Sequence, residues 1–217
     1  MDRKNIKQNN RFFVILFLAL IIFVPLFTIQ SIEGFDFWWW MSANLFLLVA
    51  LIVGTDKSFQ KEFKKDIQEG ITKKILLGLL SAAILYAIFY IGNFVVRWMF
   101  DFAGENINNV YGFKGGAGAL RIGLLMLFVI GPGEELLWRG YFQGAFAGTF
   151  GKYRGFVMGV ILYTIIHLAT GNTILILAAL TGGIFWGWMY MRYKSMLMNI
   201  VSHITWDILI FLLLPLH

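Results

Sequence analysis

The sequence has 217 residues, of which 59% are hydrophobic, 18% aromatic and only 14% charged. A soluble domain carries about 25% charged residues, so this composition excludes an ordinary water-soluble globule, a disordered chain and a nucleic-acid-binding arm. A membrane-crossing helix needs about 20 predominantly apolar residues. The composition therefore predicts an all-α, polytopic membrane helical bundle with no separate soluble domain. The sequence contains no Cys, which excludes disulfides and thiolate chemistry.

Seven hydrophobic segments are long enough to be transmembrane helices. In chain order they cover residues 12–29, 37–53, 75–96, 122–142, 156–170, 174–191 and 196–216. The first follows a basic stretch, as a signal peptide would. Its apolar run is long, however, and no small-residue cleavage site follows it, so we expect an uncleaved anchor.

The basic residues indicate the orientation in the membrane. Of the 18 Lys and Arg residues, 15 fall on the side of the N-terminus, and only Arg97, Lys114 and Arg121 fall on the other side. Because Lys and Arg accumulate in cytoplasmic loops, we expect a multi-pass cell-membrane protein with a cytoplasmic N-terminus and an external C-terminus. The net charge of +6 is then a topology signal, and we expect no nucleic-acid partner.

The segment 56–74, between the second and third predicted spans, is rich in charge. Its apolar residues Phe59, Phe63, Ile67 and Ile71 lie four apart, which predicts an amphipathic helix on the cytoplasmic surface. A solvated loop with chance apolar spacing is the alternative. We expect residues 1–119 to form N-terminal transmembrane helices and residues 120–217 to form the catalytic core of one integrated membrane domain.

Few ionisable residues lie inside the predicted spans, where a charge costs about 2.5–3.5 kcal/mol. They are Glu134, Glu135, Arg139, His167, His203 and Asp207. At about 1.5 Å of rise per residue, the fourth, fifth and seventh spans deliver these side chains to one layer, nearer the cytoplasmic face. Three helices meeting at one depth predict a functional site rather than isolated packing residues.

Spacing within each helix suggests how these side chains interact. Glu135 and Arg139 are four residues apart, so they share a helix face and can pair. Glu134 points about 100° away from Glu135 and has no local cation, which suits a general base. The preceding residues 131–133 read Gly-Pro-Gly, which breaks the helix and predicts a wet cavity beside Glu134.

Two further pairs have the same spacing of four. Tyr163 precedes His167, and His203 precedes Asp207. A phenol or a carboxylate one turn from an imidazole can orient its ring.

These residues form three motifs that resemble the CPBP family, which comprises Rce1-type CAAX prenyl proteases and the bacterial Abi (bacteriocin-processing and immunity) proteins. An EExxxR motif runs from Glu134 to Arg139. Tyr163 to His167 stands where the family has FxxxH, and His203 to Asp207 matches HxxxN/D. The resemblance covers about residues 120–216, with all three motifs in order on predicted membrane helices.

The resemblance implies an intramembrane endopeptidase that acts in the bilayer on a peptide or a membrane protein. Glu134 would activate a water with help from His167, and His203 would stabilise the oxyanion. Asp207 stands where Asn would be the better donor, because an ionised Asp repels an oxyanion. Either burial keeps Asp207 protonated, or Asp207 orients His203. Supporting roles fall to Glu135, Arg139 and Tyr163.

Other interpretations remain open at this stage. Glu134, His167 and His203 could form a three-ligand zinc site, although HExxH is absent and one Glu is needed as the base. We favour a mechanism that needs no cofactor. A non-catalytic immunity or scaffold protein of the same fold is a second alternative, and a proton-coupled transporter is a third, for which no inverted repeat is found.

Overall fold

Helices make up nearly all of the computed structural model, which describes residues 10–216. The long helices are α1 (Asn10–Ile29), α2 (Phe37–Thr55), α4 (Ile71–Met99), α9 (Lys152–His167), α10 (Thr173–Tyr193) and α11 (Met196–Asp207). The shorter elements of the periphery are α3 (Lys57–Gln68), α5 (Ala103–Gly112), η4 (Leu168–Thr170) and η5 (Ile208–Leu213). Between residues 10 and 216 the only β-pairing is an isolated bridge from Ile32 to Phe35, so the predicted all-α class is confirmed.

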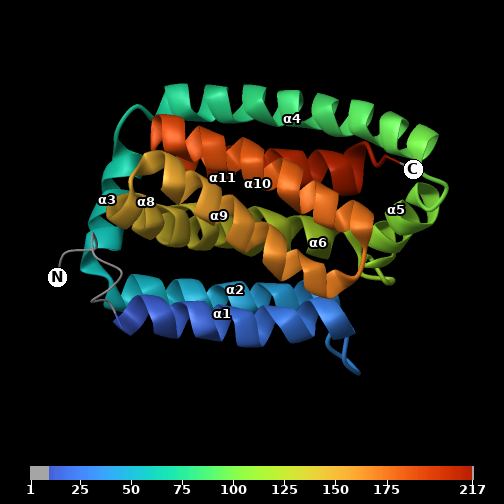
Figure 1. Cartoon of the computed structure of the whole chain (residues 1–217), viewed down its shortest axis with the longest axis horizontal. Helices are drawn as coiled ribbons and strands as arrows, with labels where there is room; N and C mark the ends of the chain where they lie inside the picture. The colour runs from blue at the N-terminus through green and yellow to red at the C-terminus, as the bar shows by residue number, and fades with distance from the viewer. Residues whose placement is uncertain (1–9, 217) are drawn as a thin grey trace.

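The helices run roughly lengthwise through one bundle (Figure 1). The α1–α2 pair lies on one side and α4 on the opposite side, with α9, α10 and α11 between them. Helix α3 closes one end of the bundle and α5 lies at the other. Residues 1–9, which include the basic Arg3, Lys4 and Lys7 of the predicted cytoplasmic N-terminus, and the terminal residue 217 lie outside the described residues.

Within residues 10–216, six helices are long and apolar enough to cross a membrane. They coincide with six of the seven predicted spans, because a chain in hydrocarbon must satisfy its backbone hydrogen bonds internally. The fourth predicted span, 122–142, falls instead in a run of short segments. That run consists of α6 (Ala119–Leu125), η2 (Met126–Ile130), α7 (Gly131–Glu134), η3 (Glu135–Gln143) and α8 (Gly144–Phe150). A count of seven spans is therefore not confirmed, although the run also lies lengthwise in the bundle (Figure 1).

The predicted amphipathic helix forms but is shorter than the expected 56–74. Helix α3 ends at Gln68, and α4 begins at Ile71, because Gly70 adopts a left-handed conformation with φ of 60°. Asp56 caps α3 by accepting a hydrogen bond from the amide of Phe59, whose ring is fully buried in the bundle. The apolar stripe of α3 thus packs at its start against the protein.

Asp66 on α3 connects this helix to α11 and to α4. Its Oδ2 accepts a hydrogen bond from the amide of Leu197 at 2.8 Å, and its Oδ1 lies 2.7 Å from Nζ of Lys74 on α4. The first turn of a helix has unpaired amide groups, so the Asp66 carboxylate satisfies one of them. The hydrogen bond to Leu197 fixes the position of α11 along the axis of the bundle, and α11 is the helix that carries His203.

Glycine lets the neighbours of α11 approach closely. A Cβ atom on Gly78 of α4 would lie 2.8 Å from Val201, and one on Gly131 of α7 would lie 2.6 Å from Ile204. Both distances are too short for a real Cβ atom. The backbones of α4 and α7 therefore approach α11 more closely than any residue other than glycine would allow. This places the interrupted α6–α8 run directly against the His203 helix.

Candidate active site

Glu134 lies where the α6–α8 run switches between α-helical and π-helical geometry. Pro132 is the second residue of the four-residue helix α7, and π-helical segments precede and follow this helix. A π-helical turn holds an extra residue and so redirects the side chains that follow. As a result Glu134 faces a cavity, whereas Glu135 faces Arg139 and α11.

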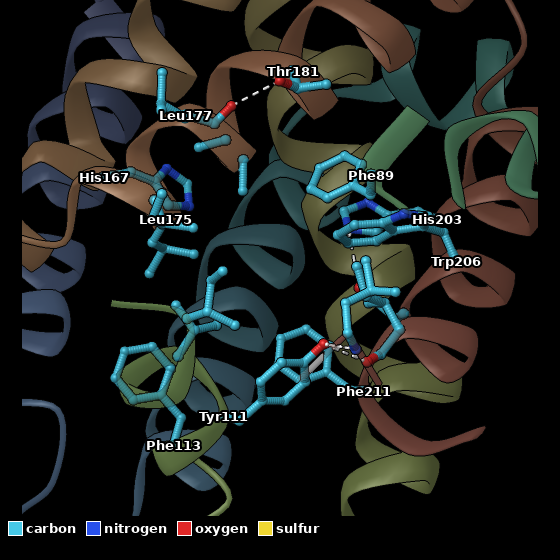
Figure 2. Close-up of a pocket in the computed structure, with 18 of the residues that line it drawn as sticks. Phe89, Tyr111, Phe113, His167, Leu175, Leu177, Thr181, His203, Trp206 and Phe211 are labelled. Atoms are coloured by element: carbon cyan, nitrogen blue, oxygen red, sulfur yellow. Dashed lines mark hydrogen bonds and ion pairs between the residues drawn. The ribbon is translucent and has the colours of Figure 1, made fainter. Parts of the chain in front are cut away.

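The cavity has a volume of about 300 Å³ and lies inside the bundle. Its wall is largely apolar, with Phe, Trp, Leu and Ile side chains from α1, α2, α4, α5, α10 and α11. Figure 2 shows His167 and His203 on two sides of it, with Phe89 and Trp206 beside His203. Five predicted site residues reach the wall: Glu134, Tyr163, His167, His203 and Asp207.

The Tyr163 hydroxyl and the His203 imidazole both lie beside one oxygen of the Glu134 carboxylate. The hydroxyl of Tyr163 donates a hydrogen bond to Oε2 at 2.9 Å, and Nε2 of His203 lies 3.6 Å from the same oxygen. Glu134 is only 5% exposed. The carboxylate is therefore held on one side, with its other oxygen available to a ligand in the cavity.

Glu135 organises a fully buried polar cluster behind the cavity wall. Its Oε1 lies 3.0 Å from Nη1 of Arg139 and 2.7 Å from Nδ1 of His203. Its Oε2 accepts a hydrogen bond from Nδ2 of Asn199 at 3.0 Å. The predicted Glu135–Arg139 pair is present. The carboxylate that orients His203 is Glu135, while Asp207 lies 3.7 Å from Nε2 on the cavity side.

The guanidinium of Arg139 lies among aromatic rings. Its centre is 4.4 Å from the ring centroid of Tyr163 and 5.4 Å from that of Trp186, and Nη2 donates to the carbonyl of Gly182 at 3.3 Å. Cation–π contacts and hydrogen bonds together compensate a buried charge. Arg139 thus ties α9 and α10 to the Glu135 cluster.

His167 is oriented by a backbone group. Its Nδ1 lies 2.7 Å from the carbonyl oxygen of Tyr163, and its ring packs 4.7 Å from that of Phe27. A carbonyl only accepts, so Nδ1 donates and Nε2 is free to accept in the cavity. The Tyr163 hydroxyl does not bind His167, because it donates to Glu134, but the Tyr163 ring packs edge-on against the imidazole with centroids 4.7 Å apart.

Sequence reasoning missed two residues of the cluster. Asn199 is fully buried and also donates to the carbonyl of Trp186 at 2.8 Å. The Trp186 ring stacks on His203 with centroids 3.8 Å apart, and its Nε1 donates to Ser202. Asn199 lies one turn before His203, a spacing that could have revealed it. Trp186 gives no such signal, because its contact depends on how α10 packs against α11.

Comparison with known families concerns the same part of the chain. Residues 116–209, which contain all three motifs, match the family model of the type II CAAX prenyl endopeptidase Rce1-like proteins. This region of the chain is therefore similar to that family. Searches of curated proteins and of solved structures gave no match. The predicted resemblance is confirmed, and the match supports an intramembrane CAAX-type endopeptidase as the general activity of a multi-pass membrane protein.

The Rce1-like region does not present a ready metal site. Across residues 10–216, no three His, Asp or Glu side chains are grouped so that they could hold a metal ion. Of the three zinc ligands considered from the sequence, His203 binds Glu135 through Nδ1 and turns Nε2 toward Glu134.

Proposed function

We propose that the chain is an intramembrane endopeptidase in which Glu134 is the general base that activates a water. The observation that supports this is the position of the Glu134 carboxylate on the wall of an apolar cavity, with the Tyr163 hydroxyl bonded to Oε2 and His203 beside it. A base in a preorganised site transfers protons efficiently because it needs little solvent reorganisation.

The reaction uses the two oxygens of Glu134 differently. A water held between Oε1 of Glu134 and Nε2 of His167 attacks the scissile carbonyl carbon and gives its proton to Oε1. The carbonyl oxygen becomes an oxyanion, which His203 stabilises by donating from Nε2 when both ring nitrogens carry protons. Collapse of the tetrahedral intermediate breaks the C–N bond, and the proton on Glu134 passes to the leaving nitrogen.

The buried cluster keeps His203 in position for this step. Glu135 binds Nδ1 of His203, and Arg139 balances the charge of Glu135. The substrate is a peptide or a membrane protein whose apolar segment enters the cavity. If the predicted orientation holds, cleavage takes place toward the cytoplasmic leaflet. We further propose that residues 120–217 form the catalytic core.

Glu134→Gln tests the proposal, because Gln keeps the size of the side chain but cannot act as a base. The purified protein in nanodiscs is given a quenched-fluorescent farnesylated CAAX peptide, and the products are identified by mass spectrometry. We expect kcat to fall by about 10²–10⁴-fold. The control is Glu33→Gln, which changes an exposed carboxylate outside the cavity and should leave the rate unchanged.

Two results would contradict the proposal. A folded Glu134→Gln protein that still cleaves the peptide excludes the general base, and a folded wild type that releases no product favours a scaffold or immunity protein. The mechanism without a metal has a separate test. Stoichiometric zinc in the purified protein, lost in His167→Ala, would contradict it.

A further inference from the structure

The proposed reaction needs more donors than the HxxxD motif supplies. A negative oxygen forms on the substrate, and hydrogen-bond donors aimed at that oxygen are often the largest contribution to catalysis. His203 provides one such donor through Nε2. Asp207 is the other polar group of this motif on the cavity wall, but an ionised carboxylate only accepts and would repel the oxyanion. While Asp207 is ionised, a second donor must come from elsewhere.

Tyr163 is placed to be that donor. It lies on α9, is 5% exposed and reaches the cavity wall. Its hydroxyl is 2.9 Å from Oε2 of Glu134, the same oxygen that Nε2 of His203 approaches at 3.6 Å. The O–H of Tyr163 and the Nε2 of His203 therefore converge on one point beside the base.

The surroundings of Tyr163 prepare its hydroxyl for this role. The Arg139 guanidinium lies over the ring, 4.4 Å from the centroid, so its positive charge stabilises negative charge that develops toward the phenolic oxygen. Trp138 packs edge-on against the ring at 5.6 Å, and a Cβ on Gly183 would lie 3.3 Å from Cδ1. The ring is thus fixed, and only the O–H bond is free to turn.

We propose that the Tyr163 hydroxyl is the second oxyanion donor of the peptidase reaction; this inference rests on the proposed function. While Glu134 is ionised, the O–H points at its Oε2. When Oε1 takes the proton of the attacking water, the carboxyl becomes neutral and negative charge appears on the substrate carbonyl oxygen. The O–H then turns about the C–O bond and donates to that oxygen. Tyr163 keeps its proton throughout, and the proton held by Glu134 goes to the leaving nitrogen.

Tyr163→Phe is the direct test, because it removes one oxygen and leaves the ring in place. With the farnesylated CAAX peptide, we expect kcat to fall by about 10²–10³-fold and KM to change by less than about threefold. The protein should remain folded, with a small decrease in melting temperature because one buried hydrogen bond to Glu134 is lost. The matched control is Tyr153→Phe on the same helix, because Tyr153 is exposed and outside the cavity. It should keep the wild-type rate.

Two readouts separate an oxyanion donor from a residue that only positions Glu134. A peptidyl trifluoromethyl ketone, which binds as a tetrahedral hydrate, should lose affinity for Tyr163→Phe by the same factor as kcat/KM falls. Asp207→Asn in the Tyr163→Phe background adds an amide N–H on the cavity wall, and we expect it to restore kcat at least tenfold.

The outcomes are distinct. The inference is overturned if Tyr163→Phe keeps its kcat, if the ketone binds it as tightly as wild type, or if Asp207→Asn restores nothing. In each of these cases an inactive Glu134→Gln leaves the proposed peptidase intact. Cleavage by Glu134→Gln, or a folded wild type without activity, refutes the proposed function, and the role of Tyr163 fails with it.

Discussion

Replacing Glu135 by Gln removes one negative charge from the buried cluster behind His203 without changing the size of the side chain. The wild-type carboxylate is fully buried and contacts three side chains, Arg139 at 3.0 Å, His203 at 2.7 Å and Asn199 at 3.0 Å. The Gln oxygen can replace only one carboxylate oxygen, either Oε1 with its two contacts or Oε2 with its one. Its NH₂ group, however, faces donors, and the Arg139 guanidinium loses its counter-charge.

The structure sets the size of the effect. Unit charges 3.0 Å apart attract by about 5 kcal/mol at an effective dielectric constant of about 20. Removing one partner of a buried ion pair costs about 3–5 kcal/mol, because the other charge stays buried. The rings of Tyr163 and Trp186 offset only part of this cost. We therefore expect Glu135→Gln to lower the free energy of unfolding by about 3–5 kcal/mol.

Equilibrium unfolding in mixed detergent micelles measures this loss, and the chain contains a matched control. Lys65 and Glu69 on the surface are also four residues apart, with 3.9 Å between Nζ and Oε1 and more than half of each side chain exposed. Glu69→Gln should cost no more than about 0.5 kcal/mol. The reasoning is refuted if the free energy of unfolding of Glu135→Gln lies within about 1 kcal/mol of the wild-type value. It is also refuted if Glu135→Gln and Glu69→Gln lower this free energy by the same amount.

Three further predictions concern packing, capping and topology. Gly131→Ala places a methyl group against α11, where a Cβ has no room, and should destabilise the protein by about 1–3 kcal/mol. Asp66→Ala removes both the amide contact at the start of α11 and the Lys74 ion pair, and should cost about 1.5–3 kcal/mol in the same unfolding assay. Because the sequence has no Cys, single cysteines report topology directly. A membrane-impermeant maleimide should label Asn108→Cys in intact cells, and Lys61→Cys only after permeabilisation.

Each of these has a result that would count against it. Gly54→Ala is the control for packing, since its Cβ meets nothing within 4 Å; equal losses at both glycines would contradict the close-approach argument. If Asp66→Ala has the same free energy of unfolding as wild type, other contacts must fix the position of α11 along the bundle. Labelling of Lys61→Cys in intact cells would reverse the predicted orientation.

The sequence determined the features that depend on composition and on neighbours within one helix. Scarce charge and long apolar runs require a helical membrane bundle, because hydrocarbon offers no partners for backbone groups. The Glu135–Arg139 pair follows from their spacing of four, which puts both side chains on one helix face. The three motifs also identified the Rce1-like region before any geometry was known. The roles of Glu134, His167, His203 and Asp207 in catalysis stay predictions.

Only the tertiary structure decided which distant groups meet. His203 binds Glu135, 68 positions away, and the Tyr163 hydroxyl binds Glu134, 29 positions away. Local spacing had paired His203 with Asp207 and Tyr163 with His167, each on its own helix. Periodicity fixes which residues share a face, but not the rotation or height of one helix against the next. The π-helical turns on either side of Glu134 and the close glycine contacts set those two quantities here.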